Sequence, residues 1–293
     1  MNKLNKPLLL KQDIQKSFNS AVDTYDEAAF FQREVADRLI ERLDYIRIEP
    51  KYILDLGAGT GYATSLLEKK YKKAKVIVFD IAEKMLQKSK QNKRWFDRKR
   101  YLCGDADHLP FADKSMDLIF SNLMLHWTHD IDKTIQEVHR ILKPNGLFLF
   151  STLGPDTLYE LRQSWQSIDA GVHVHYFTDM HNIGDFLQKA SFADSVVDME
   201  FITITYNDLK KVLLDLKDLG THNIAPDRSR GLTGKAKFNK FVHAYEKYRN
   251  PEGLIPVTYE VIYGLGWRRE VDPLQIQEIS IPIGSIQKNP LQR

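Results

Sequence analysis

Three glycines follow a short apolar segment in a spacing that suits ligand binding. Gly57, Gly59 and Gly61 come directly after the apolar start of ILDLGAGTG, residues 53–61. Glycine lets a backbone turn tightly and approach a ligand closely, and a helix that begins there offers free N–H groups. A strand-to-helix turn that binds nothing can carry the same glycines, so the loop needs support from other residues.

Aspartates at the ends of the next apolar segments give that support. Asp80 ends the run VIVFD, where a carboxylate can accept both hydrogen bonds from a ribose diol. Asp105 follows the third run, in GDADHLPF, and could meet the amino group of an adenine ring, with Ala106 beside the ring. Any one of these aspartates could instead cap a helix or hold a turn. Together with the glycines they favour an adenosine ligand.

The residues around these motifs predict the elements that position them. Apolar runs at 52–56, 76–80, 100–103, 116–121 and 146–152 alternate with helical patterns at 61–71, 82–92 and 130–142. This alternation predicts a parallel sheet with crossover helices. Upstream, helical spacing over 30–44 predicts a helix that covers one edge of the site, and residues 13–26 could fold over it.

The pattern changes after residue 153. Helices are expected near 155–168, 178–190, 207–219 and 235–249, and strands near 195–205 and 257–265. We interpret the two late strands as an antiparallel pair that completes the sheet. The predicted fold is therefore α/β and Rossmann-like, with a seven-stranded, mostly parallel sheet, helices on both faces and a helical insertion, about 206–255, before the last strand. The expected organisation is an N-terminal helical cap (1–45), one domain (46–267) and a C-terminal tail (268–293).

Composition limits the class of protein. The chain has 293 residues, 43% of them hydrophobic, which is enough for one sizeable core. The net charge of +3 requires no polyanionic partner. Cys103 is the single cysteine, which excludes an intramolecular disulfide and fits a reducing compartment, so we expect a cytoplasmic protein. No segment reads as a signal peptide or a membrane span.

The motifs together resemble the class I S-adenosylmethionine-dependent methyltransferases. The resemblance covers DLGAGTG, Asp80, GDADHLPF and the run DLIFSNLMLHW, about 100 residues. It implies S-adenosylmethionine as cofactor, S-adenosylhomocysteine as product, Asp55 near the amino group of the methionine half, and Asn122 and Leu123 facing that half. Ile81 joins the implied cofactor residues beside Asp80. NAD enzymes use similar glycines, but the turn LKPNGLFLFST resembles the methyltransferase pattern.

Flanking segments resemble a narrower family, the malonyl-[acyl-carrier protein] O-methyltransferases of biotin synthesis. These segments are KSFNSAVDTYDEAAFFQREVADRL, SNLMLHW, LLDLKDLGTHN, GLTGKAKFNKF and PVTYEVIYGLGW. With them the resemblance spans residues 13 to 267. The complex I assembly factors, some of which resemble hydroxylases, share the domain and a comparable ending, so a related methyltransferase or hydroxylase, or a non-catalytic cofactor-binding protein, is the alternative.

The family resemblance implies methyl transfer to the free carboxylate of a malonyl thioester on acyl-carrier protein. A carboxylate is ionised at neutral pH and needs no general base, so we expect positioning residues and no catalytic triad. The catalytic candidates are Tyr25, in the N-terminal segment, and His126, which with Trp127 follows the fourth strand. Each could equally be a packed structural residue. The candidates for pairing with the substrate carboxylate are Arg162, His173, His175, His181, Lys217 and His222, and the sequence does not choose among them.

Two other kinds of site are not expected. His173, His175, Asp179 and His181 have the side chains of metal ligands, but methyl transfer from a sulfonium needs no metal. The basic stretches 93–100 and 228–240 lack a nucleic-acid recognition motif. The second of them could contact an acidic carrier protein or form a solvated helical face.

Overall fold

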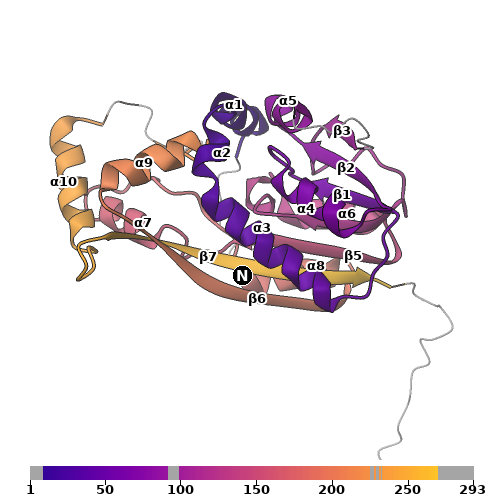
Figure 1. Ribbon diagram of the computed structural model, residues 1–293. Coiled ribbons are helices and arrows are strands. Elements are labelled where there is room, and N and C mark those ends of the chain that lie inside the picture. The colour runs from indigo at the N-terminus through magenta and orange to yellow at the C-terminus, as the bar shows by residue number, and fades with distance from the viewer. Residues whose placement is uncertain (1–8, 92–98, 225–227, 229–230, 232, 270–293) are drawn as a thin grey trace, which may run out of the picture.

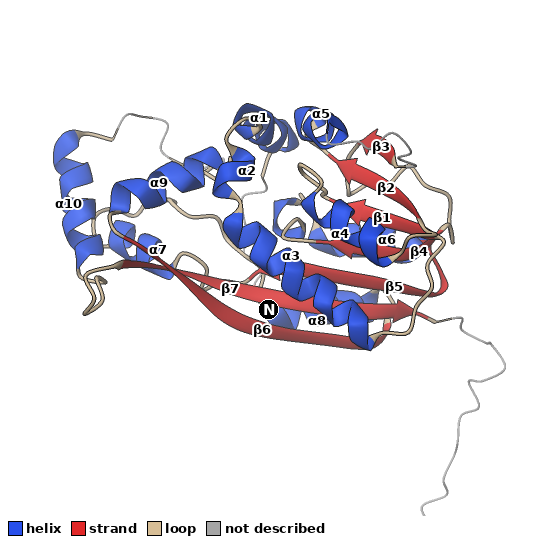
Figure 2. Cartoon of the chain, in the orientation of Figure 1, coloured by secondary structure: helices blue, strands red, loops and turns tan. Residues whose placement is uncertain are grey.

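Seven strands form one sheet, in the order β3-β2-β1-β4-β5-β7-β6. The computed structural model describes residues 9–91, 99–224, 228, 231 and 233–269. Strands β1 to β5 pair in parallel, and β7 runs antiparallel to both β5 and β6. The sheet is therefore mostly parallel with an antiparallel late pair, which confirms the predicted fold class (Figures 1 and 2).

The first half of the sheet follows the expected alternation closely. Its strands are β1 (Tyr52–Leu56), β2 (Lys75–Asp80), β3 (Arg100–Cys103), β4 (Met116–Ser121) and β5 (Leu142–Leu153). The connecting helices are α4 (Tyr62–Lys70), α5 (Glu83–Gln91) and α6 (Ile131–Ile141). Strand β5 begins four residues earlier than residue 146, where it was expected, because Leu142 already pairs with Met116 across a register shift in β4.

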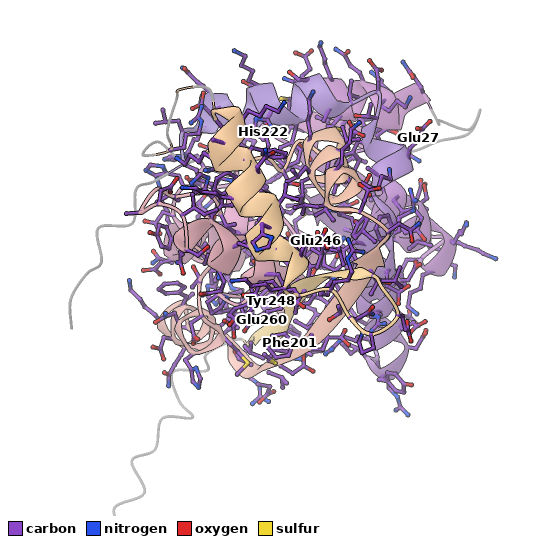
Figure 3. The ribbon with its side chains drawn as sticks, turned by 90° about the vertical axis from the view of Figure 1, so that its left-hand side faces the viewer. Glu27, Phe201, His222, Glu246, Tyr248 and Glu260 are labelled. Atoms are coloured by element: carbon purple, nitrogen blue, oxygen red, sulfur yellow. The ribbon has the colours of Figure 1, made fainter. Side chains whose placement is uncertain are left out.

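The second half adds the late strands and the insertion between them. After β5 come α7 (Tyr159–Gln166), α8 (Met180–Lys189) and β6 (Ala193–Tyr206). The chain then forms α9 (Leu209–Asp218) and α10 (Lys235–Glu246) before β7 (Ile255–Arg268). Figure 3 looks onto this end of the molecule, with α10 crossing in front and the exposed Phe201 of β6 below it.

Helices cover both faces of the sheet because alternate strand residues point to opposite sides. On one face, Leu39 of α3 (Phe30–Arg42) packs in a cluster with Ile53 and Leu118. On the other face, Ile135 of α6 and Ile183 of α8 pack with Ile119. These side chains are fully buried, so the two clusters hold the sheet rigid beneath the site.

The N-terminal helices lie along the edge where the parallel strands end. They are α1 (Lys11–Ala21), α2 (Tyr25–Ala28) and α3, followed by the short η1 (Leu43–Tyr45). Figure 1 shows α1 and α2 above the carboxyl ends of the central strands, between α5 and α9. No helix among the described residues has the length and apolar character that crossing a bilayer requires. The tail from residue 270 onward lies outside the described residues.

Candidate active site

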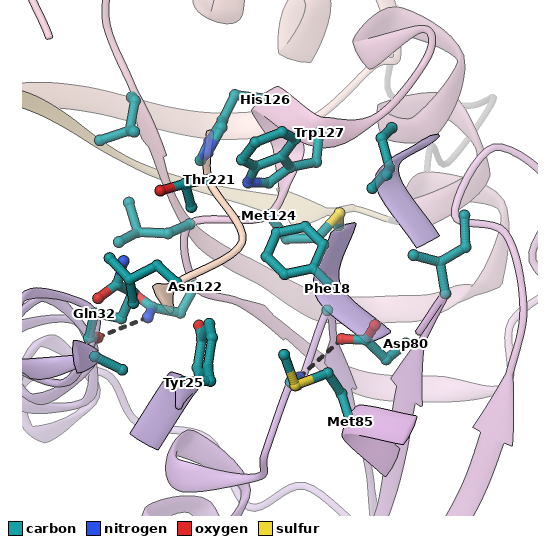
Figure 4. Close-up of a pocket in the computed structure, with 18 of the residues that line it drawn as sticks. Phe18, Tyr25, Gln32, Asp80, Met85, Asn122, Met124, His126, Trp127 and Thr221 are labelled. Atoms are coloured by element: carbon teal, nitrogen blue, oxygen red, sulfur yellow. Dashed lines mark hydrogen bonds between the residues drawn. The ribbon is translucent and has the colours of Figure 1, made fainter. Parts of the chain in front are cut away.

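A deep pocket lies at the carboxyl ends of β1, β2 and β4. Its volume is about 520 Å³, which is in the range of small-molecule sites. The lining comes from the loops that follow these strands, from α1 to α3, from α7, and from the end of α9 with residues 219–223. Figure 4 shows His126, Trp127 and Thr221 gathered at one end, and Tyr25, Asp80 and Met85 toward the other.

The glycine loop forms the wall beside β1. All three glycines have positive φ, from +55° at Gly59 to +88° at Gly61. The amides of Gly57 and Ala58 donate to the carbonyl of Phe79 at 2.8 and 3.0 Å, which fixes the loop to β2. A Cβ added at Gly57 or Gly61 would lie 2.2 Å from a neighbouring side chain, whereas one at Gly59 would meet only the Tyr25 hydroxyl, at 4.0 Å. Gly59 thus borders open pocket space that a ligand can fill, which fits a nucleoside cofactor.

Asp80 ends β2 and faces the pocket. Its Oδ2 accepts from the Gly59 amide and its Oδ1 from the Ala82 amide, both at 2.8 Å. Burial raises the pKa of Asp80, while these backbone bonds act in the opposite direction. Each carboxylate oxygen can accept more than one hydrogen bond, so a fixed Asp80 still has capacity for a ribose diol.

Asp55, near the end of β1, is the most deeply buried acid of the pocket. It is 1% exposed and accepts a hydrogen bond from the Thr64 hydroxyl. Burial, together with the negative charge of Asp80, raises its pKa to about 7, although the hydrogen bond from Thr64 acts in the opposite direction. A cationic group of a ligand beside Asp55 would favour its charged form.

Tyr25 begins α2 and lines the pocket opposite the glycine loop. Burial raises the pKa of its phenol, and the charges of Asp80 and Asp26 add to the effect. The hydroxyl is therefore protonated at neutral pH and can donate a hydrogen bond.

A lysine of α1 forms ion pairs with the loop after β3. Nζ of Lys11 lies 2.5 Å from Oδ2 of Asp105 and 2.6 Å from Oδ2 of Asp107. The pKa of Asp105 is lowered by its hydrogen bonds and charge interactions, chiefly with Lys11, although burial opposes this. Ala106 and Ile81 line the same part of the pocket, and the Ile81 carbonyl accepts from Gln15 of α1 at 3.0 Å.

Asn122 and Leu123 follow β4 and are held firmly. The Asn122 amide donates to the Gln32 carbonyl at 3.0 Å and accepts from the Ser151 hydroxyl at 2.8 Å. Leu123 has a φ of +51°, and its amide donates to the Ser151 carbonyl at 3.1 Å. Both residues line the pocket.

His126 lies on the short η2 (Leu125–Trp127), directly after this segment. Its Nδ1 is 3.3 Å from the Thr152 hydroxyl, and its ring centroid is 5.4 Å from that of Trp127. Burial lowers the pKa of His126 to about 3, with a further contribution from the charge of His175. The imidazole is neutral at physiological pH.

The structure separates the candidates for binding the substrate carboxylate. His173, His175 and His222 line the pocket. Arg162, His181 and Lys217 lie outside that lining: Arg162 donates to the carbonyls of Pro155 and Thr157, and the side chain of His181 is 85% exposed.

The same region holds no metal-type cluster. His173 pairs with Asp169 at 2.9 Å, and His181 pairs with Asp179 at 2.8 Å on the surface. Within the described part of the chain, no three His, Cys, Asp or Glu side chains come together as metal ligands would. Residues 93–98 of the first basic stretch and part of stretch 228–240 lie outside the described residues.

Sequence reasoning missed several lining residues, among them Lys11, Phe18, Gln32, Arg33 and Thr221. Lys11, Phe18, Gln32 and Arg33 lie on α1 and α3, in the N-terminal helical segment that was expected to cover the site. That expectation was the sequence feature that could have indicated them. Nothing in the local sequence indicated that Lys11 meets Asp105, because the two residues are far apart in the chain.

Known proteins share both the fold and the sequence. Residues 54–150 match the family model described as "Methyltransferase domain". The YcgJ protein of Bacillus subtilis superposes with a TM-score of 0.57 at 20% identity, over 81% of this chain and 99% of that one. A Haemonchus contortus phosphoethanolamine N-methyltransferase, solved with S-adenosylhomocysteine, gives 0.51 at 15% identity, over 86% and 58%. Fold, glycine loop and strand-end acids together define a class I S-adenosylmethionine-dependent methyltransferase.

Closer relatives identify the family. A malonyl-[acyl-carrier protein] O-methyltransferase of Gallionella capsiferriformans is 45% identical over 271 residues, covering 90% of this chain and 93% of that protein. A protein of the same name with the suffix 1, from Coxiella burnetii, is 42% identical over 276 residues, covering 93% and 94%. The chain belongs to the malonyl-[acyl-carrier protein] O-methyltransferase family.

Proposed function

We propose that the protein transfers the methyl group of S-adenosylmethionine to the free carboxylate of a malonyl thioester carried on acyl-carrier protein. The observation that carries this proposal is the single continuous pocket. It joins the glycine loop, where the methyl donor fits, to the space around His126 and Trp127, where an acyl group can enter. The family relatives are named for the same activity, and this chain matches them over nearly their whole length. They do not favour the assembly-factor alternative.

Each cofactor residue has a part in this proposal. Asp80 accepts hydrogen bonds from the ribose hydroxyls. Asp55 faces the ammonium group of the methionine half, and the positive charge of that group offsets the buried negative charge of Asp55. Asn122 and Leu123 border that half. Ile81, Asp105 and Ala106 border the adenine, with Lys11 as the partner that holds Asp105 in place. Gly57, Gly59 and Gly61 provide the turn and the close approach.

The chemistry is a direct displacement. The bound sulfonium supplies an electrophilic methyl carbon. A carboxylate oxygen forms the new O–CH₃ bond, the electrons of the S–CH₃ bond remain on sulfur, and no proton is transferred. Alignment in a pocket that excludes water can contribute roughly 7–11 kcal/mol in favourable cases. Tyr25 contributes as a protonated hydroxyl that orients one of the reacting groups.

The carrier protein and the location belong to the same proposal. The thioester arm enters the pocket while the carrier stays outside, and the lysines of 228–240 contact its acidic surface. One exposed cysteine, Cys103, suits the reducing cytoplasm that was expected.

Product analysis tests the function directly. The purified protein is incubated with labelled S-adenosylmethionine and malonyl-acyl-carrier protein, and the carrier is examined for label and mass. Acetyl-acyl-carrier protein serves as the control because it lacks the free carboxylate. We expect one added methyl group on the malonyl species alone. Tight cofactor binding without transfer to malonyl-acyl-carrier protein would contradict the proposal.

A further inference from the structure

Lysine and arginine side chains of the pocket differ in whether a carboxylate neutralises them. In the described part of the chain, those that line the pocket are Lys11, Arg33 and Lys99. Lys11 pairs with Asp105, and Lys99 pairs with Glu68 at 2.8 Å. Both lysines therefore have carboxylate partners within the protein, which leaves Arg33 as the cation to consider for an anionic group of a ligand.

Arg33, on the first turn of α3, has a backbone partner. Its Nη1 donates to the Asp26 carbonyl at 2.6 Å, and no carboxylate among the described residues forms an ion pair with it. The Asp26 side chain accepts from Thr60 of the glycine loop at 2.6 Å, so these contacts hold the guanidinium at the cofactor end of the pocket. Burial raises the pKa of Tyr25 and the charge of Arg33 opposes this shift, which also indicates that the guanidinium lies near the phenol.

Gln32, the preceding residue, has a side-chain amide that the protein leaves unused. Its backbone carbonyl accepts from the Asn122 side chain at 3.0 Å, which fixes the start of α3 against the segment after β4 (Figure 4). Gln32 lines the pocket, and its side-chain Oε1 is buried without a hydrogen-bond partner among the described residues. A buried acceptor without a partner is rare and unfavourable, so Oε1 indicates a donor that a ligand supplies.

The start of α3 also favours an anion nearby. Ala29, at the N-cap position, makes no side-chain hydrogen bond to the first turn, and it lines the pocket together with Gln32 and Arg33. The partial positive charge of a helix N-terminus stabilises a negative group beside it. An unused acceptor and an available cation on neighbouring residues match a ligand group that carries a positive and a negative charge close together.

We propose that Gln32 and Arg33 bind the amino-acid head group of the methyl donor. Arg33 pairs with the carboxylate of the head group, and Gln32 Oε1 accepts from its ammonium group, which also faces Asp55. The inference rests on the proposed function for the identity of the methyl donor. Fixing the head group limits the orientations of the sulfonium methyl, so the same contacts that bind the donor also position its methyl group.

Two ligands that differ in the head group test this assignment. S-adenosylhomocysteine carries the amino-acid group, whereas methylthioadenosine keeps the adenosine and the thioether and lacks it. The full-length protein and the variants Arg33→Met and Gln32→Leu are titrated with each ligand by calorimetry. We expect affinity for S-adenosylhomocysteine to fall about 10- to 100-fold in Arg33→Met and about 5- to 10-fold in Gln32→Leu, as for loss of hydrogen bonds to charged groups. Affinity for methylthioadenosine should change less than about 3-fold.

Two further variants serve as controls. Arg33→Lys keeps the positive charge and should recover part of the lost affinity for S-adenosylhomocysteine. Arg47→Met removes an exposed arginine that is not part of the pocket lining, and it should change neither affinity.

The possible outcomes separate this inference from its alternatives. Equal weakening for the two ligands would assign Gln32 and Arg33 a structural role and overturn the inference, as would an unchanged affinity for S-adenosylhomocysteine in both variants. If Arg33→Met weakens only the binding of malonyl-acyl-carrier protein, the carboxylate bound by Arg33 is that of the acyl substrate, and the inference is wrong. The two ligand titrations need no acyl carrier. A protein that shows the expected pattern and methylates no malonyl carrier would therefore contradict the proposed function alone.

Discussion

Asp55 links cofactor binding to pH. Its pKa in the folded protein, about 7, lies above the value of about 4 expected in the unfolded chain. The folded state therefore holds a proton that the unfolded state has lost, and this contribution to stability declines as pH rises through 7. A cofactor ammonium group favours the charged carboxylate, so ligand binding releases the proton.

We expect S-adenosylhomocysteine to raise the melting temperature more at pH 8 than at pH 6, because Asp55 is already ionised at the higher pH. Calorimetric melts with and without ligand measure this shift. The variant Asp55→Asn should lose the pH dependence together with much of the affinity. If the ligand raises the melting temperature of the wild type equally at both pH values, Asp55 does not interact with the ammonium group of the ligand.

The Tyr25 hydroxyl should affect the methyl transfer step more than cofactor binding. Because its pKa is raised, the hydroxyl stays protonated and acts by donating a hydrogen bond. Tyr25→Phe is expected to slow single-turnover transfer about 5- to 10-fold, the value of one such bond, with the cofactor Kd nearly unchanged. If the variant transfers the methyl group at the wild-type rate, the Tyr25 hydroxyl has no part in the transfer step and the residue contributes only packing.

Local chemistry explains which site residues the sequence predicted. The glycine loop and Asp80 were identifiable because their backbone requirements and their positions at strand ends are set within a few residues. The partner of the substrate carboxylate was not identifiable, because the choice depends on distant contacts. Arg162 is bound to carbonyls of the segment before α7, and His181 points to solvent; neither fact is visible in the sequence. The roles of the site residues stay predictions.

At the scale of elements, α1 is attached to the cofactor end of the pocket by Lys11. This side chain bridges Asp105 and the buried Asp107, and so joins the start of α1 to the loop after β3. We expect this contact to open when the cofactor leaves, because Lys11 and Asp105 both line the pocket. Because Lys11 is partly exposed, its ion pairs are screened by salt and their contribution is modest.

Lys11→Met is expected to accelerate cofactor dissociation about 3- to 10-fold in stopped-flow experiments, with a smaller difference from wild type at high salt. Lys16→Met is the matched control, since Lys16 is exposed on the same helix. If both variants release the cofactor at the wild-type rate, α1 is not held closed by this contact.

Periodicity predicted most elements but not the order of the last strands. An antiparallel late pair was expected and is confirmed, yet β7 lies between β5 and β6 rather than at the edge. That order depends on packing between residues far apart in sequence. A Cβ at Gly264 of β7 would lie 2.1 Å from Cζ of Phe150 on β5, so the packing of β7 beside β5 requires glycine at this position. The division into cap, domain and tail stays a prediction.

At the scale of the whole molecule, the N-terminal helices and the insertion close the pocket together. Ser17 of α1 donates to the Gly220 carbonyl at 2.7 Å, and Thr24 donates to the Asp218 carbonyl at 2.8 Å. Gly220, after α9, has a φ of +71°, and a Cβ there would lie 3.1 Å from Cβ of Ala21. Only glycine permits both this turn and this close approach.

These contacts predict that the two segments respond to ligand as one unit. Hydrogen exchange measured by mass spectrometry should show that S-adenosylhomocysteine protects α1 and residues 216–224 to a similar extent, because opening either segment breaks the contacts between them. Gly220→Ala should abolish the parallel response and lower stability by about 1–2 kcal/mol through its left-handed backbone. Gly234→Ala, at a position with open space and an ordinary φ, is the matched control. Protection of α1 without any change in residues 216–224 of the wild type would show that the cofactor end closes independently of the insertion, and the acceptor end would then have to be closed by the substrate itself.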